Sequence, residues 1–153
     1  MGMAPIPAGG IIFREKRFLE AISVPAPYLA GGKVWQAGTR PGASSLAVWA
    51  MIKHLGFEGY KKVVRKAMEL SRWFAGELKK IPGVYLIREP LLNIVSFGTE
   101  NLEEVEEELK KRGWGISAHR GYIRIVMMPH VKKEHLEEFL EDLREVTVHS
   151  IRS

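Results

Sequence analysis

The sequence predicts an α+β fold in which a small, mostly antiparallel sheet carries helices on one face. Residues 57–146 show clean amphipathic periodicity in the order helix, two strands, helix, two strands, helix. Residues 1–56 differ, because they are poor in charge and rich in Gly, Pro and Ala. This change of character predicts a domain boundary after residue 56, with residues 57–153 forming the α+β domain.

The elements expected in residues 1–56 are a buried strand at 10–13, a helical turn at 18–22 and a glycine-rich loop at 31–42. Ser44 or Ser45 can then cap a helix that runs to about Leu55 and ends at Gly56. Residues 46–52 are apolar on every side, so this helix needs burial all round. The rest of the chain is too small to enclose it. We therefore expect its surroundings to be missing here or to come from another chain.

The elements expected in residues 57–146 are helices at 58–80, at 102–112 and after Pro129, with strands at 84–88, at 93–97, from 116 and at 122–127. The last helix has its apolar positions at helical spacing: Leu136, Phe139, Leu140, Leu143 and Val146. Residues 146–151 are β-branched and polar, and they do not prolong that pattern.

Composition excludes several classes of protein. The chain has no cysteine, which rules out disulfides, thiolate metal sites and a catalytic thiol. No apolar run approaches the roughly 20 residues of a membrane helix, so we expect a soluble, cytoplasmic protein without a membrane partner. The net charge of +5 comes from lysines within helices that also carry glutamates, and no basic block is present. We therefore expect no nucleic-acid partner. The Lys/Glu-rich, cysteine-free composition is typical of a thermophile.

Two segments could bind an anion. Gly38, Thr39 and Arg40 form a glycine-containing loop before the apolar helix, where backbone N–H groups and side-chain donors can meet a phosphate or carboxylate. A purely structural loop explains the same residues. Arg124 alternates with Ile123 and Ile125 in the strongest strand, where it needs an acidic or anionic partner if half-buried. The alternation is equally compatible with a solvent-facing arginine.

The residues alone identify no catalytic group. No nucleophile elbow, P-loop, HExxH or GxGxxG pattern is present. The five histidines lack the spacing of a metal site, so structural or capping roles are expected and no metal is predicted.

Four segments together resemble a known family: residues 1–14, 38–40, 90–95 and 123–130. They are similar to archaeal group II PLP-dependent amino-acid decarboxylases of the L-tyrosine/L-aspartate type, and the resemblance extends over about residues 1–146. It implies fold type I and a dimeric enzyme, with a PLP-binding large domain followed by a small α+β domain. On that basis residues 1–56 are a remnant of the large domain, and residues 57–153 are the small domain.

The resemblance also implies roles for residues of this chain. Gly38, Thr39 and Arg40 correspond to a loop that approaches the cofactor phosphate, and Arg124 to an arginine that grips the substrate carboxylate. The family's Schiff-base lysine precedes the segment that matches residues 1–3. The chain therefore lacks it and is expected to be inactive alone, with PLP binding not expected. The substrate could be tyrosine, aspartate or glutamate.

Two departures from the family pattern stand out: the loop before Gly38 is shorter, and the tail after Glu145 differs. Together with the missing lysine segment they indicate a truncated or altered gene product. Two alternatives remain, namely a fragment of another fold type I PLP enzyme such as an aminotransferase, and a stand-alone α+β module for binding or assembly. A homo-oligomer that buries the apolar helix is compatible with each reading.

Overall fold

The computed structural model describes residues 3, 8, 11–24, 42–116, 118, 119 and 121–150. The chain divides into two compact units, here called the N-terminal unit (Gly2–Phe57) and the C-terminal unit (Glu58–Ser153). The elements in chain order are α1 (Lys16–Ile22), α2 (Gly42–Leu78), β1 (Val84–Arg88), β2 (Ile94–Thr99), α3 (Leu102–Lys111), β3 (Ala118–His119), β4 (Tyr122–Val126) and α4 (Lys133–Ser150).

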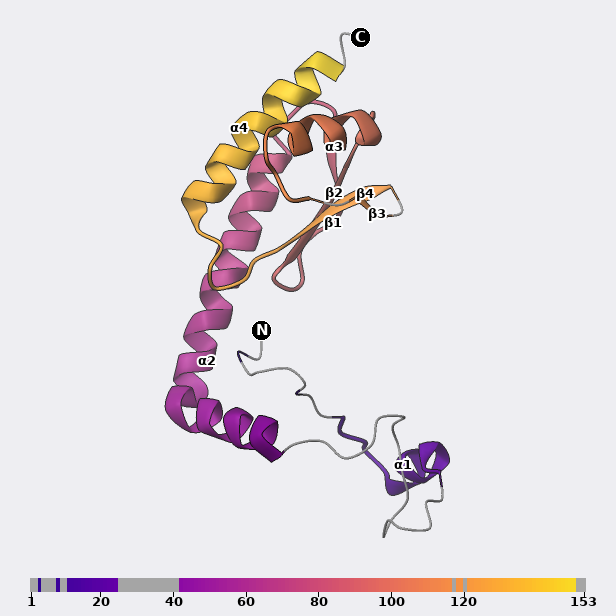
Figure 1. Ribbon diagram of the computed structural model, residues 1–153, viewed down its shortest axis with the longest axis vertical. Coiled ribbons are helices and arrows are strands. Elements are labelled where there is room, and N and C mark those ends of the chain that lie inside the picture. The colour runs from indigo at the N-terminus through magenta and orange to yellow at the C-terminus, as the bar shows by residue number, and fades with distance from the viewer. Residues whose placement is uncertain are drawn as a thin grey trace. The chain divides into compact units, whose positions relative to one another are not determined.

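The C-terminal unit is a two-layer α+β structure, as predicted. Its four strands form a sheet in the order β1-β2-β4-β3, and every neighbouring pair is antiparallel. The helices α3 and α4 and the C-terminal part of α2 lie on one face of this sheet (Figure 1). The opposite face, here called the open face, has no helix over it in the described part of the unit.

The core of the C-terminal unit is built around aromatic rings from different elements. Phe74 of α2, Phe97 of β2 and Phe139 of α4 lie with ring centroids 6.1 to 6.4 Å apart, and Trp114 meets Phe139 edge-on at 5.1 Å. Edge-to-face contacts of this kind add to the free energy gained from burial. The core thus joins both layers of the unit.

Helix α2 is interrupted at Gly56, where the backbone has φ 57° and ψ −170°. Only glycine adopts this region readily, so the residue separates two helical segments. The predicted helix end at Gly56 is confirmed. The first segment begins earlier than predicted, at Gly42 instead of after Ser44 or Ser45.

Helix α3 ends with two backbone hydrogen bonds from residues that follow the helix. Gly113, with φ 94°, donates its N–H to the carbonyl of Lys110 at 2.9 Å, and Trp114 donates to Leu109 at 3.0 Å. This is a Schellman motif, which requires a left-handed residue at its glycine. It turns the chain so that Trp114 reaches the core.

Two predictions for single elements are wrong. Residues 11–13 form no strand, and Ile12 is 98% exposed, because the described residues provide no neighbouring strand or core for it. The tail does continue the last helix, since α4 runs to Ser150. Thr147 fits because its buried hydroxyl donates a hydrogen bond to the Leu143 carbonyl at 2.7 Å, which satisfies the polar group within the helix.

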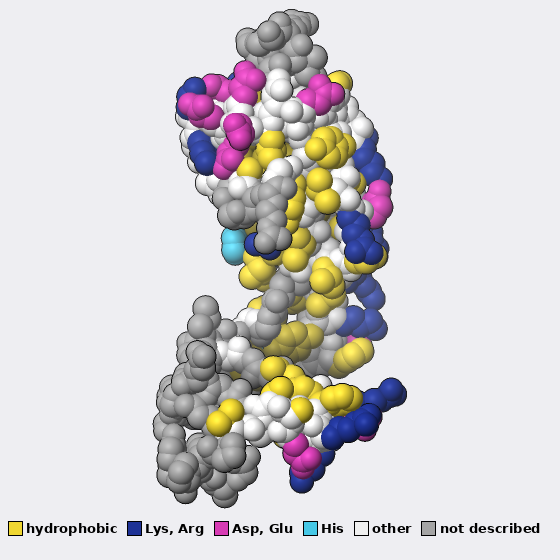
Figure 2. All heavy atoms as spheres, turned by 90° about the vertical axis from the view of Figure 1, so that its right-hand side faces the viewer, with side chains coloured by type: hydrophobic (Ala, Val, Ile, Leu, Met, Phe, Trp, Pro, Cys, Tyr) yellow, Lys and Arg dark blue, Asp and Glu magenta, His cyan; other side chains and the backbone are white. Residues whose placement is uncertain are grey.

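The first segment of α2 exposes the apolar side chains that the sequence predicts to need cover. Leu46, Trp49 and Ile52 are 65%, 57% and 53% exposed and recur at helical spacing. In the space-filling view, hydrophobic side chains reach the surface on the face shown, with Lys and Arg along one flank (Figure 2). Within this chain, therefore, the described residues do not enclose that helix segment.

Candidate functional site

Arg124 lies on the open face of the sheet. In β4, Ile123 is buried in the core, and the alternation of the strand turns Arg124 to the other side, where it is exposed. Its partner on the neighbouring strand β2 is Ser96. The solvent-facing possibility left by the sequence is thus the one the structure adopts, and Arg124 is available to an anion from outside the unit.

Arg88 reaches the same face through a β-bulge. Strict alternation along β1 would put Arg88 on the core side with Leu86, which pairs with Phe97. The register shifts between Leu86 and Arg88, so that Arg88 pairs with Ser96 instead. A bulge of this kind re-aims a side chain. Sequence reasoning missed Arg88 because a period-two pattern does not reveal an inserted residue.

Arg88, Ser96 and Arg124 therefore form one row across β1, β2 and β4. With adjacent strands about 4.8 Å apart, the two arginine positions are roughly 10 Å apart with the serine between them. The described residues next to this row on the open face are uncharged: Tyr85, Ile94, Tyr122 and Val126. The row presents two cations and a hydroxyl, a donor set suited to carboxylates or phosphates.

The predicted cofactor loop, Gly38, Thr39 and Arg40, lies outside the described residues. Its role in holding the PLP phosphate therefore stays a prediction. Every lysine that the structure describes is exposed. A Schiff-base lysine needs desolvation to lower its pKa, so these lysines do not fit that role. Among the described residues, therefore, no lysine has the environment of a Schiff-base lysine, and we derive no reaction step through PLP from them.

The described histidines show no metal-binding arrangement. Within the described ranges, no group of three His, Cys, Asp or Glu residues could hold a metal ion. His135 accepts a hydrogen bond at Nδ1 from the backbone N–H of Lys132 at 3.4 Å, at the start of α4. That contact is a capping role, of the kind predicted for the histidines.

Most of the lysines that stand next to one another in the sequence, such as Lys110 and Lys111, contact glutamates. Lys110 contacts Glu106 at 2.6 Å, Lys80 contacts Glu77 at 2.7 Å, and other pairs follow the same spacing along the helices. Such exposed pairs contribute little to stability but neutralise the lysine charges locally. The basic residues thus have the pattern of solvated helix faces.

A groove of about 810 Å³ lies between α2 and the connection from β4 to α4. Its floor is apolar, with Leu70, Trp73 and Met128 among the lining residues, and Lys62, Lys66 and Lys132 line it as well. Lys133 also lines it, with its ammonium 4.7 Å from the centroid of the Trp73 ring. This groove is separate from the arginine row, because it lies beside the helical layer.

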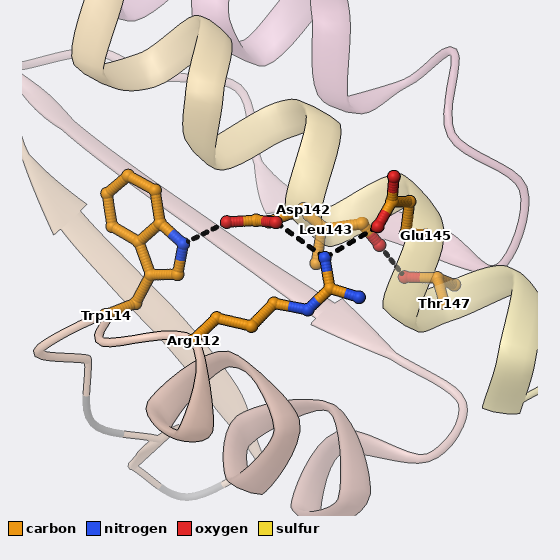
Figure 3. A network of polar contacts seen from close by, with 6 residues as sticks. All are labelled: Arg112, Trp114, Asp142, Leu143, Glu145 and Thr147. Atoms are coloured by element: carbon orange, nitrogen blue, oxygen red, sulfur yellow. Dashed lines mark hydrogen bonds and ion pairs between the residues drawn. The ribbon is translucent and has the colours of Figure 1, made fainter.

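A polar network ties the end of α3 to α4 (Figure 3). The Trp114 indole N–H donates to Asp142 at 2.7 Å, and Arg112 contacts Asp142 at 2.6 Å and Glu145 at 2.7 Å. The indole hydrogen bond, followed by the contact with Arg112, holds the pKa of Asp142 below its ordinary value. The same carboxylates raise the pKa of Arg112. The network is structural, since it links helices on the covered side of the sheet.

Comparison with known proteins identifies the family. Residues 1–100 match the pyridoxal-dependent decarboxylase conserved domain. The chain therefore belongs to the pyridoxal-dependent decarboxylase family. No helix in the described part of the chain is both long and apolar enough to cross a membrane.

Several curated relatives match this chain over most of its length. The chain is 83% identical over 149 residues to the probable L-aspartate decarboxylase of Thermococcus gammatolerans and 80% identical over 149 residues to the L-aspartate decarboxylase of Thermococcus kodakarensis. It is 74% identical to the L-aspartate/L-glutamate decarboxylase of Pyrococcus horikoshii. Each alignment covers 95% of this chain and 39% of the relative, so the chain spans about two fifths of their length. These relatives come from archaeal thermophiles.

Solved structures show the same fold. The chain superimposes on a sphingosine-1-phosphate lyase from Burkholderia pseudomallei with a TM-score of 0.71 and 23% identity, covering 90% of this chain and 33% of that one. For the glutamate decarboxylase of Lactobacillus brevis the TM-score is 0.65 and the identity 18%, over 85% and 33% of the two chains. The fold is therefore that of the corresponding part of fold type I PLP enzymes.

Proposed function

We propose that this chain is the C-terminal part of a PLP-dependent decarboxylase that converts an acidic amino acid, L-aspartate or L-glutamate, to an amine and CO2. The observation that carries the proposal is the 83% identity, over 95% of this chain, to a probable L-aspartate decarboxylase. Tyrosine is a weaker candidate, because the probable L-tyrosine/L-aspartate decarboxylase of Methanosphaera stadtmanae is only 45% identical to this chain.

Arg124 is proposed to bind the substrate's α-carboxylate. Its exposure on the open face, with Ser96 beside it, supports this role, since a guanidinium can grip a carboxylate through two parallel hydrogen bonds. PLP, when bound in such enzymes, supplies the electron sink for loss of CO2. What Arg124 adds is orientation, since a fixed carboxylate keeps the bond to be broken in one geometry.

We propose that residues 1–56 belong to the PLP-binding large domain and residues 57–153 form the small domain. The separation of the compact units after Phe57 supports this boundary, and so does the helix break at Gly56. Gly38, Thr39 and Arg40, within the first part, are proposed to approach the PLP phosphate.

A cytoplasmic homo-oligomer is the proposed state of the whole enzyme. Its support is the exposed stripe of Leu46, Trp49 and Ile52, which a second subunit or the remaining part of the enzyme would cover. The alternative, a stand-alone α+β module, is favoured by one observation only: the C-terminal unit has a complete core of its own. A module of that kind has no use for the exposed helix segment.

The test is a PLP titration of the purified 153-residue chain, followed by borohydride reduction and mass spectrometry. We expect no covalent adduct and no release of CO2 from L-aspartate, because no lysine described in the structure is desolvated. A stoichiometric adduct on one lysine would show that this chain carries a PLP site by itself. That result would contradict the assignment as a dependent part of a larger enzyme.

A further inference from the structure

The arginine row has more positive charge than one α-carboxylate requires. Arg88 and Arg124 flank Ser96 from opposite sides, and the bulge in β1 is what brings Arg88 there. Neither guanidinium forms an ion pair with a carboxylate in the described part of the chain, whereas Arg112 contacts two. The row is thus a site with two free cations.

The packing of the unit does not explain this arrangement. Both arginines are exposed and neither contributes to the core. At roughly 10 Å in water the repulsion between the two guanidinium groups is only about 0.4 kcal/mol. The fold can therefore tolerate the pair even though the two side chains do not stabilise it. Other exposed arginines, such as Arg65 and Arg72, lie on helix α2, where most of the neighbouring charged residues are lysines. Arg88 and Arg124 instead share one hydroxyl on a sheet face whose described neighbours are uncharged.

We propose that Arg88 is a specificity-determining residue that binds the side-chain carboxylate of a dicarboxylic amino acid, while Arg124 binds its α-carboxylate. This inference rests on the proposed function. An acidic amino acid carries two carboxylates separated by a short carbon chain, and two arginines on either side of a serine can take one each. The Ser96 hydroxyl lies between them, where it can donate to either carboxylate.

The same geometry disfavours substrates with one carboxylate. A neutral or aromatic side chain would bring no anion to Arg88, so such a substrate would keep only the contact of its α-carboxylate with Arg124. The row therefore selects by attraction of the second carboxylate to Arg88. The selected substrate class is therefore acidic amino acids.

The inference is tested by amide NMR titration of the isotope-labelled 153-residue chain with L-aspartate and, separately, L-alanine, which lacks the second carboxylate. We expect L-aspartate to shift the amide signals of Arg88, Ser96 and Arg124 at lower concentration than L-alanine. In Arg88→Met, the affinity for L-aspartate should fall about fivefold, to the level of L-alanine, and the affinity for L-alanine should not change. Arg72→Met removes an exposed arginine from α2 and should change neither.

Each other outcome is decisive. If Arg88→Met keeps the preference for L-aspartate, or if neither ligand shifts the row in the unmodified chain, the role of Arg88 is overturned. If Arg124→Met abolishes binding of both ligands while Arg88→Met has no effect, only Arg88 is misassigned and the proposed role of Arg124 stands. The proposed assignment of this chain as a dependent part of a larger enzyme is tested separately, because a PLP adduct on this chain would contradict it.

Discussion

The two units of this chain differ in how far their apolar side chains are buried. In the C-terminal unit, residues from both layers are fully enclosed, among them Phe74, Phe97, Phe139 and Leu143. In the described part of the N-terminal unit no residue is buried, and Leu46 is among the exposed apolar side chains. One unit carries a core within its own sequence, while the other carries apolar side chains that its described residues leave exposed.

The contrast explains why a chain of this length can hold a stable domain and an incomplete one. The C-terminal unit alternates helices and strands, so each element has an apolar side that meets another. Residues 46–52, in the helix segment before Gly56, are apolar on all sides, a pattern typical of a helix that is buried all round. The chain spans 39% of the length of the probable L-aspartate decarboxylase that it matches, so in that relative further residues are available to cover the corresponding segment.

The difference in burial between the two units is tested most directly by replacing one leucine with alanine in each unit. Leu143→Ala removes a fully buried side chain and should lower the free energy of unfolding by about 2 to 5 kcal/mol. Leu46→Ala removes a side chain that is 65% exposed and should change it by less than about 0.5 kcal/mol. Denaturant unfolding of dilute protein measures both.

Equal losses for the two variants would contradict the division into a complete and an incomplete unit. A loss for Leu46→Ala that grows with protein concentration would sharpen the comparison instead. It would show that a second copy of the chain covers the exposed stripe.

A second test concerns the polar network that links α3 to α4. Asp142→Asn keeps the size of the side chain but removes the charge that Arg112 and the Trp114 indole stabilise. We expect a loss of about 1 to 2 kcal/mol at pH 7, measured by denaturant unfolding. The matched variant Glu145→Gln alters the more exposed partner of Arg112 and should cost less than about 0.5 kcal/mol.

The effect of Asp142→Asn should depend on pH. The pKa of Asp142 is lowered in the folded state from its ordinary value of 3.8, so its contribution is complete above that value and is lost as the pH falls through the lower folded pKa. The stability difference from the unmodified chain should therefore shrink below about pH 4. A difference that stays constant there would show that the charge of Asp142 plays no part.

Much of this architecture could be predicted from the sequence, because burial imposes a period. The stripe Leu136, Phe139, Leu140, Leu143 predicts α4 correctly, and Gly56 predicts the helix break, since few residues other than glycine adopt its backbone angles. The end of α4 was missed because Thr147 satisfies its hydroxyl inside the helix, a contact that composition does not show.

The candidate site could be predicted only in part. Arg124 stands out because a charge interrupts an apolar strand, yet the side it faces depends on register. Arg88 gives no such signal, because the bulge that turns it to the open face is a property of the pairing between β1 and β2. The roles of Gly38, Thr39 and Arg40 come from family resemblance alone, and they fall outside the described residues.

The smallest expected effect concerns two buried threonines of the C-terminal unit, which differ in whether the hydroxyl forms a hydrogen bond. Thr99, at the end of β2, is buried, and its hydroxyl has no hydrogen-bond partner among the described residues. Replacing it with valine removes an unsatisfied polar group at nearly constant size, so Thr99→Val should raise the free energy of unfolding by about 1 kcal/mol. Thr147→Val removes a hydroxyl that is bonded to Leu143 and should lower it by up to about 1 kcal/mol. If the two substitutions change the free energy of unfolding in opposite directions, stability in this unit depends on whether each buried hydroxyl forms a hydrogen bond. If both substitutions lower it, the Thr99 hydroxyl has a hydrogen-bond partner.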